Sequence, residues 1–343
     1  MKVGISSYGV YIPKYRIKSD EYVKVWGYFA AARVKEKAVA RFDEDSLTMA
    51  VEASINALEN AGLQPESLDA LYFATTTPPY EEKLLSASLA SSLGCRKDIA
   101  LADYTNSTRD GVTALLSCMD FVRSGRGKWA LAVASDNPIS TPESDLEHGL
   151  GASATAFLVG SGDVIAEFED ACQVGWESWG GRFRRYGKKH TVVLGITPLE
   201  RVEYTGLLSY VIKRLMEKRN LKIKDVKYLV LHQIDGRMPY RIAASLGFND
   251  EQIRDSMLVS LVGDTGVCSS LIGFVNVLDK AEPGDRILVA SYGSGAGADA
   301  FTLIVSGNKS GKSFPSISDY LESREYVDYA TYLRWRRILL TET

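Results

Sequence analysis

GASATAFLVGSG (residues 151–162) and GAGADAFTLIVSG (residues 295–307) are two versions of one pattern, in which small residues lead into a run of large apolar side chains. The likeness extends along the chain. The segment DALYFATT begins at Asp69 and DVKYLVLH begins at Asp225, 156 positions later, and the same separation relates LAVAS to ILVAS further on. Two markers with one spacing indicate a duplicated domain, because solenoid repeats have periods of about 20–50 residues.

Short runs rich in Val, Ile, Ala and Tyr alternate with segments whose apolar residues recur at helical spacing, which is typical of an α/β protein. Asp43 or Asp45 is placed to cap the helix that this spacing predicts over residues 43–63. We predict an N-terminal half at residues 1–165, a C-terminal half at 166–308 with a basic and aromatic insertion near 176–190, and a Tyr-rich tail at 309–343.

The bulk composition excludes several classes of protein. The chain has 343 residues, 45% of them apolar and 24% charged, which is ordinary for a globular protein with a sizeable core. A net charge of −3 argues against a nucleic-acid-binding protein. No apolar run reaches transmembrane length, and the start MKVGISSYGVYI reads as a strand rather than a leader. We therefore expect a cytoplasmic protein that binds neither nucleic acid nor membranes.

Cysteines and histidines are few and scattered. The four cysteines have no C-x-x-C spacing, which favours reduced, mostly buried thiols: Cys95, Cys118, Cys172 and Cys268. The three histidines are equally far apart, so we expect no metal site.

The duplication pairs polar residues that follow corresponding strands. Thr76 corresponds to His232, and Thr108 corresponds to Asp264, at the same separation of 156. Ligands of open α/β sheets collect at the carboxyl ends of the strands. These four residues therefore form the candidate site.

Four segments carry a family resemblance: YGVYIPKYRIK near the start, HQIDGRMPYRIAASLGF, VLDKAEPGDRILVASYGSGAGADAF, and YVDYATYLRWRRI near the end. With them the chain resembles the thiolase superfamily, and more closely the archaeal-type 3-hydroxy-3-methylglutaryl-CoA synthases and the ketoacyl synthase III proteins.

The resemblance implies two βαβαβαββ halves in a layered α-β-α-β-α architecture. It implies a CoA thioester as substrate or ligand, with no covalently bound cofactor. It also implies a homodimer or pseudo-dimer. Relatives in this branch assemble with a thiolase-type catalytic subunit and a small zinc-ribbon/OB-fold protein, which implies such partners here.

The same resemblance places substitutions at two catalytic positions. Family members take an acyl group from CoA with a cysteine at the start of the first-half helix, and that nucleophile position is Thr108 here. The general acid/base glutamate position is Thr76, in ATTTPPYEEK. The family's histidine is retained as His232, and the ketoacyl synthase asparagine position holds Asp264, in GDT.

The chemistry of these substitutions leaves several interpretations open. A threonine hydroxyl ionises far less readily than a thiol and needs a strong neighbouring base. His232, oriented by Asp264, would supply a Thr/His/Asp arrangement with Thr108; alternatively, Thr108 and Asp264 only cap their helices. His232 would polarise a thioester carbonyl or stabilise an enolate, or it is a core residue. Cys268 is a substitute nucleophile or a buried small residue.

Two further segments are candidates for binding CoA or substrate. Gly293 and Gly295 in YGSGAG allow a close approach of backbone N–H groups to a ligand, or only a tight turn. In WESWGGRFRRYGKKH, Arg182 and Arg185 belong to a basic cluster, which forms a lid that attracts CoA phosphates or a solvated loop. The aromatic tail packs on its own domain or docks a partner.

Three functions fit these residues. We favour a non-acylating, pseudo-catalytic subunit of a heteromeric acyl-CoA C-acyltransferase or thiolase complex, in which a partner supplies the cysteine. The second is a stand-alone C-acyltransferase, decarboxylase or retro-aldol enzyme that acts on CoA thioesters with His232. The third is a genuine hydroxymethylglutaryl-CoA synthase.

Overall fold

The repeated elements account for most of the chain. The computed structural model describes residues 2–177, 181–193, 197–307 and 315–339. The first copy consists of β1 (Val3–Tyr11), α2 (Ser46–Ala61), β4 (Ala70–Thr75), α3 (Leu85–Leu93), β5 (Ala100–Thr105), α4 (Asp110–Arg123), β6 (Ala130–Asp136) and β7 (Ser153–Ser161). The second consists of β8 (Ala166–Gly175), α6 (Thr197–Arg219), β11 (Tyr228–Leu231), α7 (Met238–Leu246), α8 (Asp250–Arg254), α9 (Val259–Val262), α10 (Ser269–Lys280), β12 (Arg286–Gly293) and β13 (Gly297–Val305).

Nine of these strands form one hydrogen-bonded sheet in the order β11-β12-β13-β8-β1-β7-β6-β4-β5. The two copies contribute mirrored strand orders and meet where β1 pairs with the start of β8. At this junction Gly4 lies opposite Glu167, and a Cβ atom on Gly4 would stand 2.0 Å from the Ala166 carbonyl oxygen. Only glycine therefore lets the two halves join this closely.

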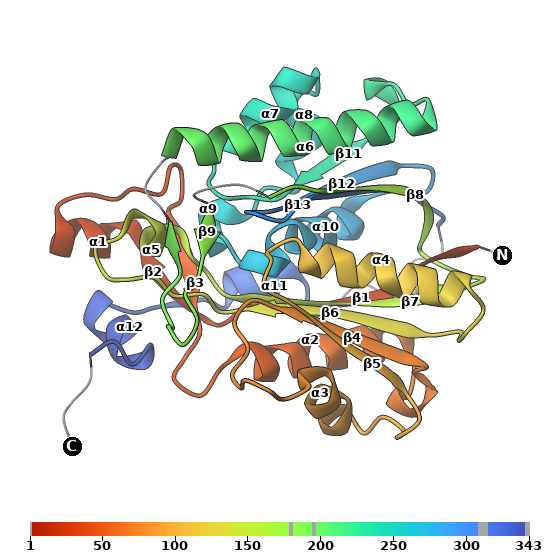
Figure 1. The fold of residues 1–343 in the computed structure, drawn as a ribbon, viewed down its shortest axis with the longest axis horizontal. Coiled ribbons are helices and arrows are strands. Elements are labelled where there is room, and N and C mark those ends of the chain that lie inside the picture. The colour runs from red at the N-terminus through yellow and green to blue at the C-terminus, as the bar shows by residue number, and fades with distance from the viewer. Residues whose placement is uncertain (1, 178–180, 194–196, 308–314, 340–343) are drawn as a thin grey trace.

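The helices complete five layers. In Figure 1, α6 and α7 cover the outer side of the second-half strands, α4 and α10 lie between the two halves, and α2 and α3 cover the outer side of the first-half strands. The predicted α-β-α-β-α architecture is confirmed. Asp45, rather than Asp43, caps α2, because its carboxylate accepts the N–H groups of Leu47 and Thr48.

The second copy departs from the expected βαβαβαββ order. Where the first copy has β5, the second has the short helix α9, so the described part of the sheet has nine strands rather than ten. The side-chain carbonyl of Gln233 accepts the N–H groups of Leu258 and Val259, at 2.9 and 3.0 Å. This side chain satisfies the first donors of α9 and holds the segment helical.

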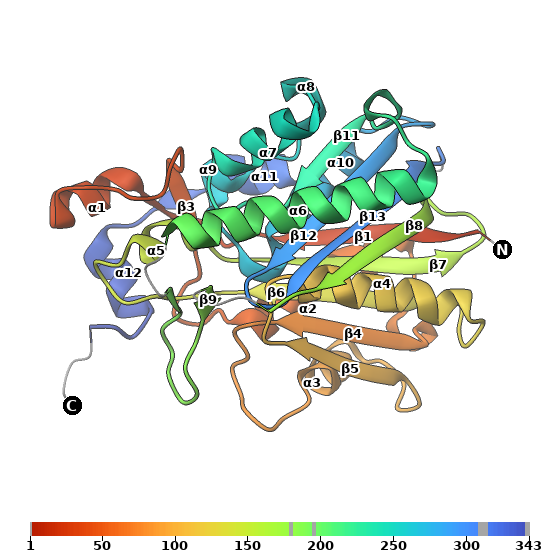
Figure 2. The same ribbon diagram turned by 45° about the horizontal axis from the view of Figure 1, so that its top comes forward.

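A group of smaller elements gathers at the end of the molecule opposite the N-terminus (Figure 2). They are β2 (Tyr15–Lys18), α1 (Ser19–Trp26), β3 (Glu36–Val39), α5 (Asp145–Gly149), β9 (Arg182–Phe183), β10 (Val192–Val193), β14 (Glu325–Tyr326) and α12 (Tyr329–Trp335), and we call this group the end cap. The short helix α11 (Ile317–Glu322) precedes β14. The strand β9 lies in the predicted insertion near 176–190 and pairs as an antiparallel hairpin with β10, which lies just after it.

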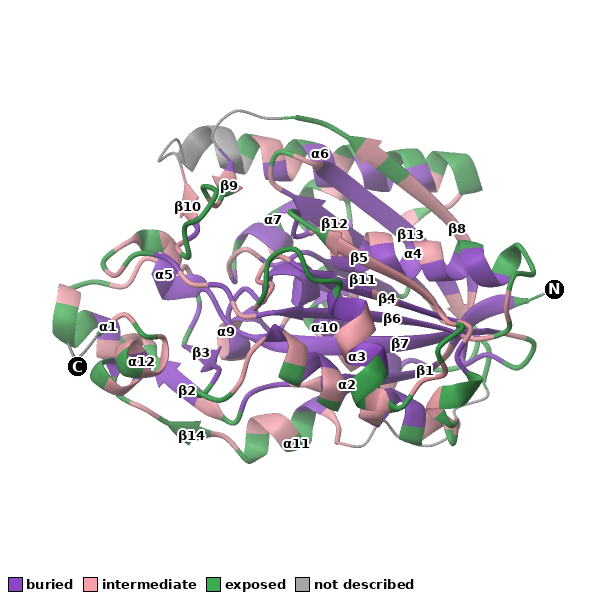
Figure 3. Ribbon diagram, turned by 60° about the horizontal axis from the view of Figure 1, so that its bottom comes forward, coloured by how far each residue is buried: buried purple, intermediate pink, exposed green. Residues whose placement is uncertain are grey.

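The Tyr-rich tail packs on its own chain. Tyr329 and Tyr332 of α12 are buried against Tyr22 of α1 and Ile17 of β2. The strands of the main sheet are mostly buried except β5 and the second half of β8, whereas exposed residues gather on α11 and on the loops (Figure 3). Within the described residues, no helix combines the length and apolar character needed to cross a membrane.

Candidate functional site

The turn between β5 and α4 carries the predicted nucleophile position. Asn106 has a left-handed backbone (φ 80°), and the Ser107 N–H donates to Asp110 Oδ2 at 3.0 Å, which ties the turn to the start of α4. Thr108 is buried and donates its hydroxyl proton to the Tyr292 carbonyl oxygen at 2.9 Å. Thr108 does not cap α4, so the capping interpretation of this residue is wrong.

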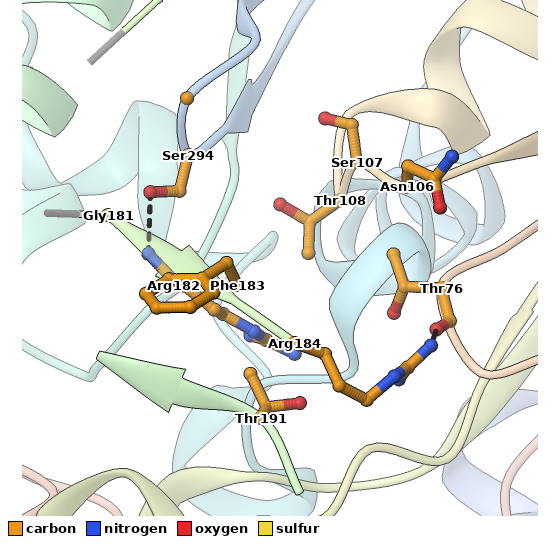
Figure 4. A pocket seen from close by; sticks show the side chains of 11 residues that line it. Thr76, Asn106, Ser107, Thr108, Gly181, Arg182, Phe183, Arg184, Thr191 and Ser294 are labelled. Atoms are coloured by element: carbon orange, nitrogen blue, oxygen red, sulfur yellow. Dashed lines mark hydrogen bonds between the residues drawn. The ribbon is translucent and has the colours of Figure 1, made fainter. Parts of the chain in front are cut away.

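Two cavities meet at Thr108. The first has a volume of about 480 Å³ and the second about 450 Å³, and both are lined by Thr108, Arg182 and Ser294. Thr76 lines the first cavity, whereas His232 and Asp264 line the second. Figure 4 shows the first cavity, with Thr76 and Thr108 on one side and the arginines of the hairpin on the other. The structure thus brings the four residues of the candidate site together.

His232 directly follows β11 and is buried. Its Nε2 atom lies 3.9 Å from Asp264 Oδ1, which is too long for a hydrogen bond. The pKa of His232 is lowered to about 4, mainly by burial; the negative charge of Asp264 opposes this change, and the positive charge of Arg182 adds to it. The imidazole is therefore neutral at pH 7. A hydroxyl of Tyr204 donates to the His232 carbonyl oxygen and fixes the backbone at this position.

Asp264 joins the two halves at the second cavity. Its Oδ2 atom accepts a hydrogen bond from Arg182 Nη1 at 2.8 Å, and its Oδ1 atom accepts the Gly266 N–H at 3.0 Å. The backbone of Asp264 forms hydrogen bonds with Gly149, the last residue of α5, and with Gly151 just after it. Each carboxylate oxygen thus has a hydrogen-bond partner, and the carboxylate orients Arg182 rather than His232.

Thr76 donates two hydrogen bonds to a buried carboxylate that the sequence analysis did not identify. Asp136, at the end of β6, accepts the Thr76 N–H at 2.7 Å and the Thr76 hydroxyl at 2.8 Å. It also accepts the hydroxyls of Thr75 and Thr77 and the Val267 N–H. A fully buried carboxylate is retained here because five donors replace its hydration.

No described cysteine lines either cavity. Cys268 is buried in the short turn before α10, donates to the Ala134 carbonyl oxygen at 3.1 Å, and has a pKa raised well above its ordinary value by burial. Burial also raises the pKa of Cys118. These thiols are therefore packed core residues, and Cys268 is no substitute nucleophile. No group of three His, Cys, Asp or Glu residues that could hold a metal ion occurs in the described ranges.

The predicted binding residues fall in different places. Arg182 and Gly295 line the first cavity. Gly293 does not; a Cβ atom there would stand 2.1 Å from Ser107 Oγ, so this glycine allows the two halves to approach. Arg185 is exposed on the hairpin. Trp179 of the predicted lid lies outside the described residues. A role for any of them in binding stays a prediction.

Three polar residues of the site escaped the sequence analysis. Asp136 and Tyr292 end the segments LAVASD and ILVASY, and they are related by the same separation of 156. Extending the repeat by one residue would have found both. Asp110, whose pKa is raised to about 7 by burial, is the first residue of α4 and matches no motif.

Comparisons with known proteins define the class. The chain superposes on a solved structure of MvaS in complex with 3-hydroxy-3-methylglutaryl coenzyme A with a TM-score of 0.88, at 19% identity over 99% of this chain and 92% of that one. It superposes on 3-oxoacyl-[acyl-carrier-protein] synthase III from Aquifex aeolicus with a TM-score of 0.81, at 21% identity over 88% and 99%. The fold is thus thiolase-like.

Sequence comparisons narrow this class. Residues 216–304 match the family model of the 3-oxoacyl-[acyl-carrier-protein] synthase III C-terminal region. The chain is 36% identical to the hydroxymethylglutaryl-CoA synthase of Methanopyrus kandleri, over 98% of both chains. It is 37% identical to that of Methanocaldococcus jannaschii, over 97% of this chain and 98% of the other. The chain belongs to the hydroxymethylglutaryl-CoA synthase family.

Proposed function

We propose that this chain binds CoA thioesters in its two joined cavities, forms no acyl-enzyme of its own, and acts as the non-acylating subunit of a heteromeric acyl-CoA C-acyltransferase or thiolase complex. Its relatives are named for an activity on a CoA thioester, and two structures of the same fold were solved with 3-hydroxy-3-methylglutaryl-CoA and with CoA. In the proposed complex, a thiolase-type partner supplies the cysteine.

The observation that carries the proposal is the hydrogen bond from Thr108 to the Tyr292 carbonyl oxygen. A nucleophilic hydroxyl must give its proton to a base. Thr108 donates its hydroxyl proton in a hydrogen bond to a carbonyl oxygen, and a carbonyl oxygen is too weak a base to remove that proton. His232 is a weak base, because its pKa lies near 4.

A second function is favoured by His232 itself. A neutral imidazole on the cavity wall can donate a hydrogen bond to a thioester carbonyl and stabilise the enolate that decarboxylation or retro-aldol cleavage produces. Decarboxylation needs neither a thiol nor a base, whereas retro-aldol cleavage also needs a base that takes the hydroxyl proton of the substrate. The chain would then be a stand-alone enzyme.

Chromatography of the thioesters after incubation with the purified chain decides between these functions, because decarboxylation and retro-aldol cleavage change the acyl group and leave the thioester bond intact. We expect calorimetry to detect binding of acetyl-CoA, acetoacetyl-CoA, malonyl-CoA and 3-hydroxy-3-methylglutaryl-CoA, while all four are recovered unchanged. Turnover that is lost in His232→Ala would support the stand-alone enzyme. Condensation of acetyl-CoA with acetoacetyl-CoA by the chain alone would identify a genuine hydroxymethylglutaryl-CoA synthase and contradict the proposal.

A further inference from the structure

A buried ion pair connects the hairpin to the second half of the chain beside His232. Arg182 Nη1 lies 2.8 Å from Asp264 Oδ2, and these two side chains are 11% and 6% exposed. The other carboxylate oxygen, Oδ1, lies 3.9 Å from His232 Nε2. A movement of about 1 Å would bring these two atoms to hydrogen-bonding distance. Asp264 is therefore bonded to a guanidinium and lies close to an imidazole to which it is not bonded.

The position of Arg182 is fixed by the backbone of the hairpin. Ser294 Oγ accepts the Arg182 N–H at 2.8 Å (Figure 4). A Cβ atom on Gly181 would stand 1.8 Å from the same Oγ atom, so only glycine allows this close approach. Next to β10, the Thr191 N–H donates to the Ile139 carbonyl oxygen at 2.8 Å. The hairpin is therefore held beside both of its strands, and Arg182 reaches Asp264 from an anchored backbone.

The imidazole of His232 is available to a ligand. Its Nδ1 atom is buried and has no hydrogen-bond partner among the residues that the structure describes. The side chain lines the second cavity together with Arg182 and Asp264. A buried polar atom without a partner costs free energy, and a ligand that bonds to it in the cavity recovers this cost.

The other titratable groups near His232 are two tyrosines and one carboxylate. The ring of Tyr292 lies 6.1 Å from that of His232, measured between centroids. Tyr204 donates its hydroxyl proton to the His232 carbonyl oxygen. Asp235, which lines the same cavity, accepts two backbone N–H groups at the start of α7. Besides burial, the two charges of the ion pair are therefore the ones that act on the imidazole, in opposite directions.

We propose that Arg182 is a positioning residue: its ion pair keeps the Asp264 carboxylate from bonding His232, so that the imidazole stays uncharged and free to donate a hydrogen bond to a ligand in the second cavity. A carboxylate bonded to the imidazole would instead orient the ring and favour its protonated form, as in a Thr/His/Asp arrangement with Thr108. Arg182 thus determines which partner the carboxylate has. The inference goes beyond the proposed function and holds for any ligand of this cavity.

NMR titration of the histidine side chains in the isotope-labelled full chain tests the inference, with His232→Gln to identify the signal. Because burial is the main cause that lowers the pKa of His232 to about 4, the wild-type ring should stay neutral down to about pH 5. Arg182→Gln should raise the midpoint by at least about one pH unit, because Asp264 is then free to bond the imidazole. Arg182→Lys retains the charge and should retain the wild-type midpoint.

Two further variants separate the role of Arg182 from general effects. Arg184→Gln removes the same charge from the same hairpin, but Arg184 donates to the Thr76 carbonyl oxygen at 2.6 Å, so the midpoint should not change. Water that reached His232 in Arg182→Gln would also raise the midpoint, since burial is the main cause of the low pKa. Combining Arg182→Gln with Asp264→Asn should instead return the midpoint to the wild-type value or below, because no carboxylate is left to bond the imidazole.

Four results would overturn the inference. They are a wild-type midpoint near the ordinary 6.5, an unchanged midpoint in Arg182→Gln, an equal rise in Arg184→Gln, and a rise that persists in the double variant. Arg182→Met, which retains a long side chain without the charge, gives the same test if the glutamine variant does not fold. The titration contains no thioester, so its outcome is independent of whether the chain binds CoA thioesters.

Discussion

His232 is a buried imidazole that its surroundings keep neutral. Desolvation is the main cause, and the nearby Arg182 adds to it, whereas Asp264 at 3.9 Å offsets only part of the effect. A neutral imidazole can polarise a carbonyl group, but it is poorly suited to deprotonate an alcohol. A neutral His232 therefore fits the binding role that we propose and does not support acyl transfer by Thr108.

The pH dependence of stability follows from this pKa. Folding lowers the pKa of His232 from the ordinary 6.5 to about 4, so the unfolded chain binds the extra proton between these values. The stabilisation is fully present above about pH 6.5 and is lost as the pH falls toward 4. We expect acidification from pH 7 to 4 to destabilise the wild-type chain by about 2–3 kcal/mol more than His232→Gln. Urea unfolding at each pH measures this difference.

The control for this experiment is His190→Gln, which should keep the wild-type response to pH because His190 is only partly buried. Equal acid sensitivity in the wild type and in His232→Gln would contradict a depressed pKa at His232.

The sequence predicted which residues meet at the site, but not how they bond. The repeat and the rule of strand ends were enough to bring Thr76, Thr108, His232 and Asp264 together. The direction of the Thr108 hydroxyl depends on a carbonyl oxygen of Tyr292, 184 positions away. Every residue type carries a backbone carbonyl group, so the sequence could not predict this contact between the two halves.

Among the elements of the end cap, α5 also lines the second cavity. Glu147 in α5 accepts the hydroxyl of Tyr22 at 3.0 Å and that of Tyr329 at 3.4 Å, and it lies 3.6 Å from Lys37 Nζ. Lys37 is fully buried, and desolvation lowers its pKa to about 8 although Glu147 opposes this change. Because Gly149 in the same helix accepts the N–H of Asp264, the tail helix α12 supports the site through Glu147.

Glu147→Gln would leave the Lys37 charge buried without its counter-ion. We expect the free energy of unfolding to fall by about 3–5 kcal/mol. Urea unfolding at pH 7 measures the change, with the exposed Glu81→Gln as the control that should change stability little. A loss below about 1 kcal/mol would show that the pair does not hold the end cap together.

At the scale of elements, periodicity predicted the α/β class and the helix α2, with Asp43 or Asp45 as its cap, because these depend on local residue patterns. The layers were implied by the family resemblance. The replacement of a strand by α9 was not predictable, since it depends on Gln233, a side chain about 25 positions away in sequence. The hairpin β9–β10 was expected only as an insertion, because its two short strands are too brief to show alternation.

At the scale of the whole molecule, the two edges of the sheet differ. The edge strand β11 is buried, whereas the edge strand β5 is half-buried or exposed along its whole length and, among the described strands, pairs with β4 alone. An accessible edge presents unpaired backbone groups that can accept another strand. We propose that a second copy of this chain pairs there.

Light scattering after size-exclusion chromatography tests this association. We expect the wild type to form a homodimer and Ala102→Lys, in the middle of β5, to shift it toward monomer, because identical charges then meet across a twofold axis. Ser91→Lys on the exposed side of α3 adds the same charge and should leave the dimer intact. A wild-type monomer at micromolar concentration, or an unchanged dimer in Ala102→Lys, would contradict pairing through β5.

The central claim is that the chain offers a CoA-thioester site without a working nucleophile. Intact-protein mass spectrometry after incubation with acetyl-CoA tests it most directly. We predict an unmodified mass for the wild type and a gain of one acetyl group for Thr108→Cys, with Thr108→Ser unmodified as the control. A stable acetyl adduct on Thr108 of the wild-type chain would contradict the account.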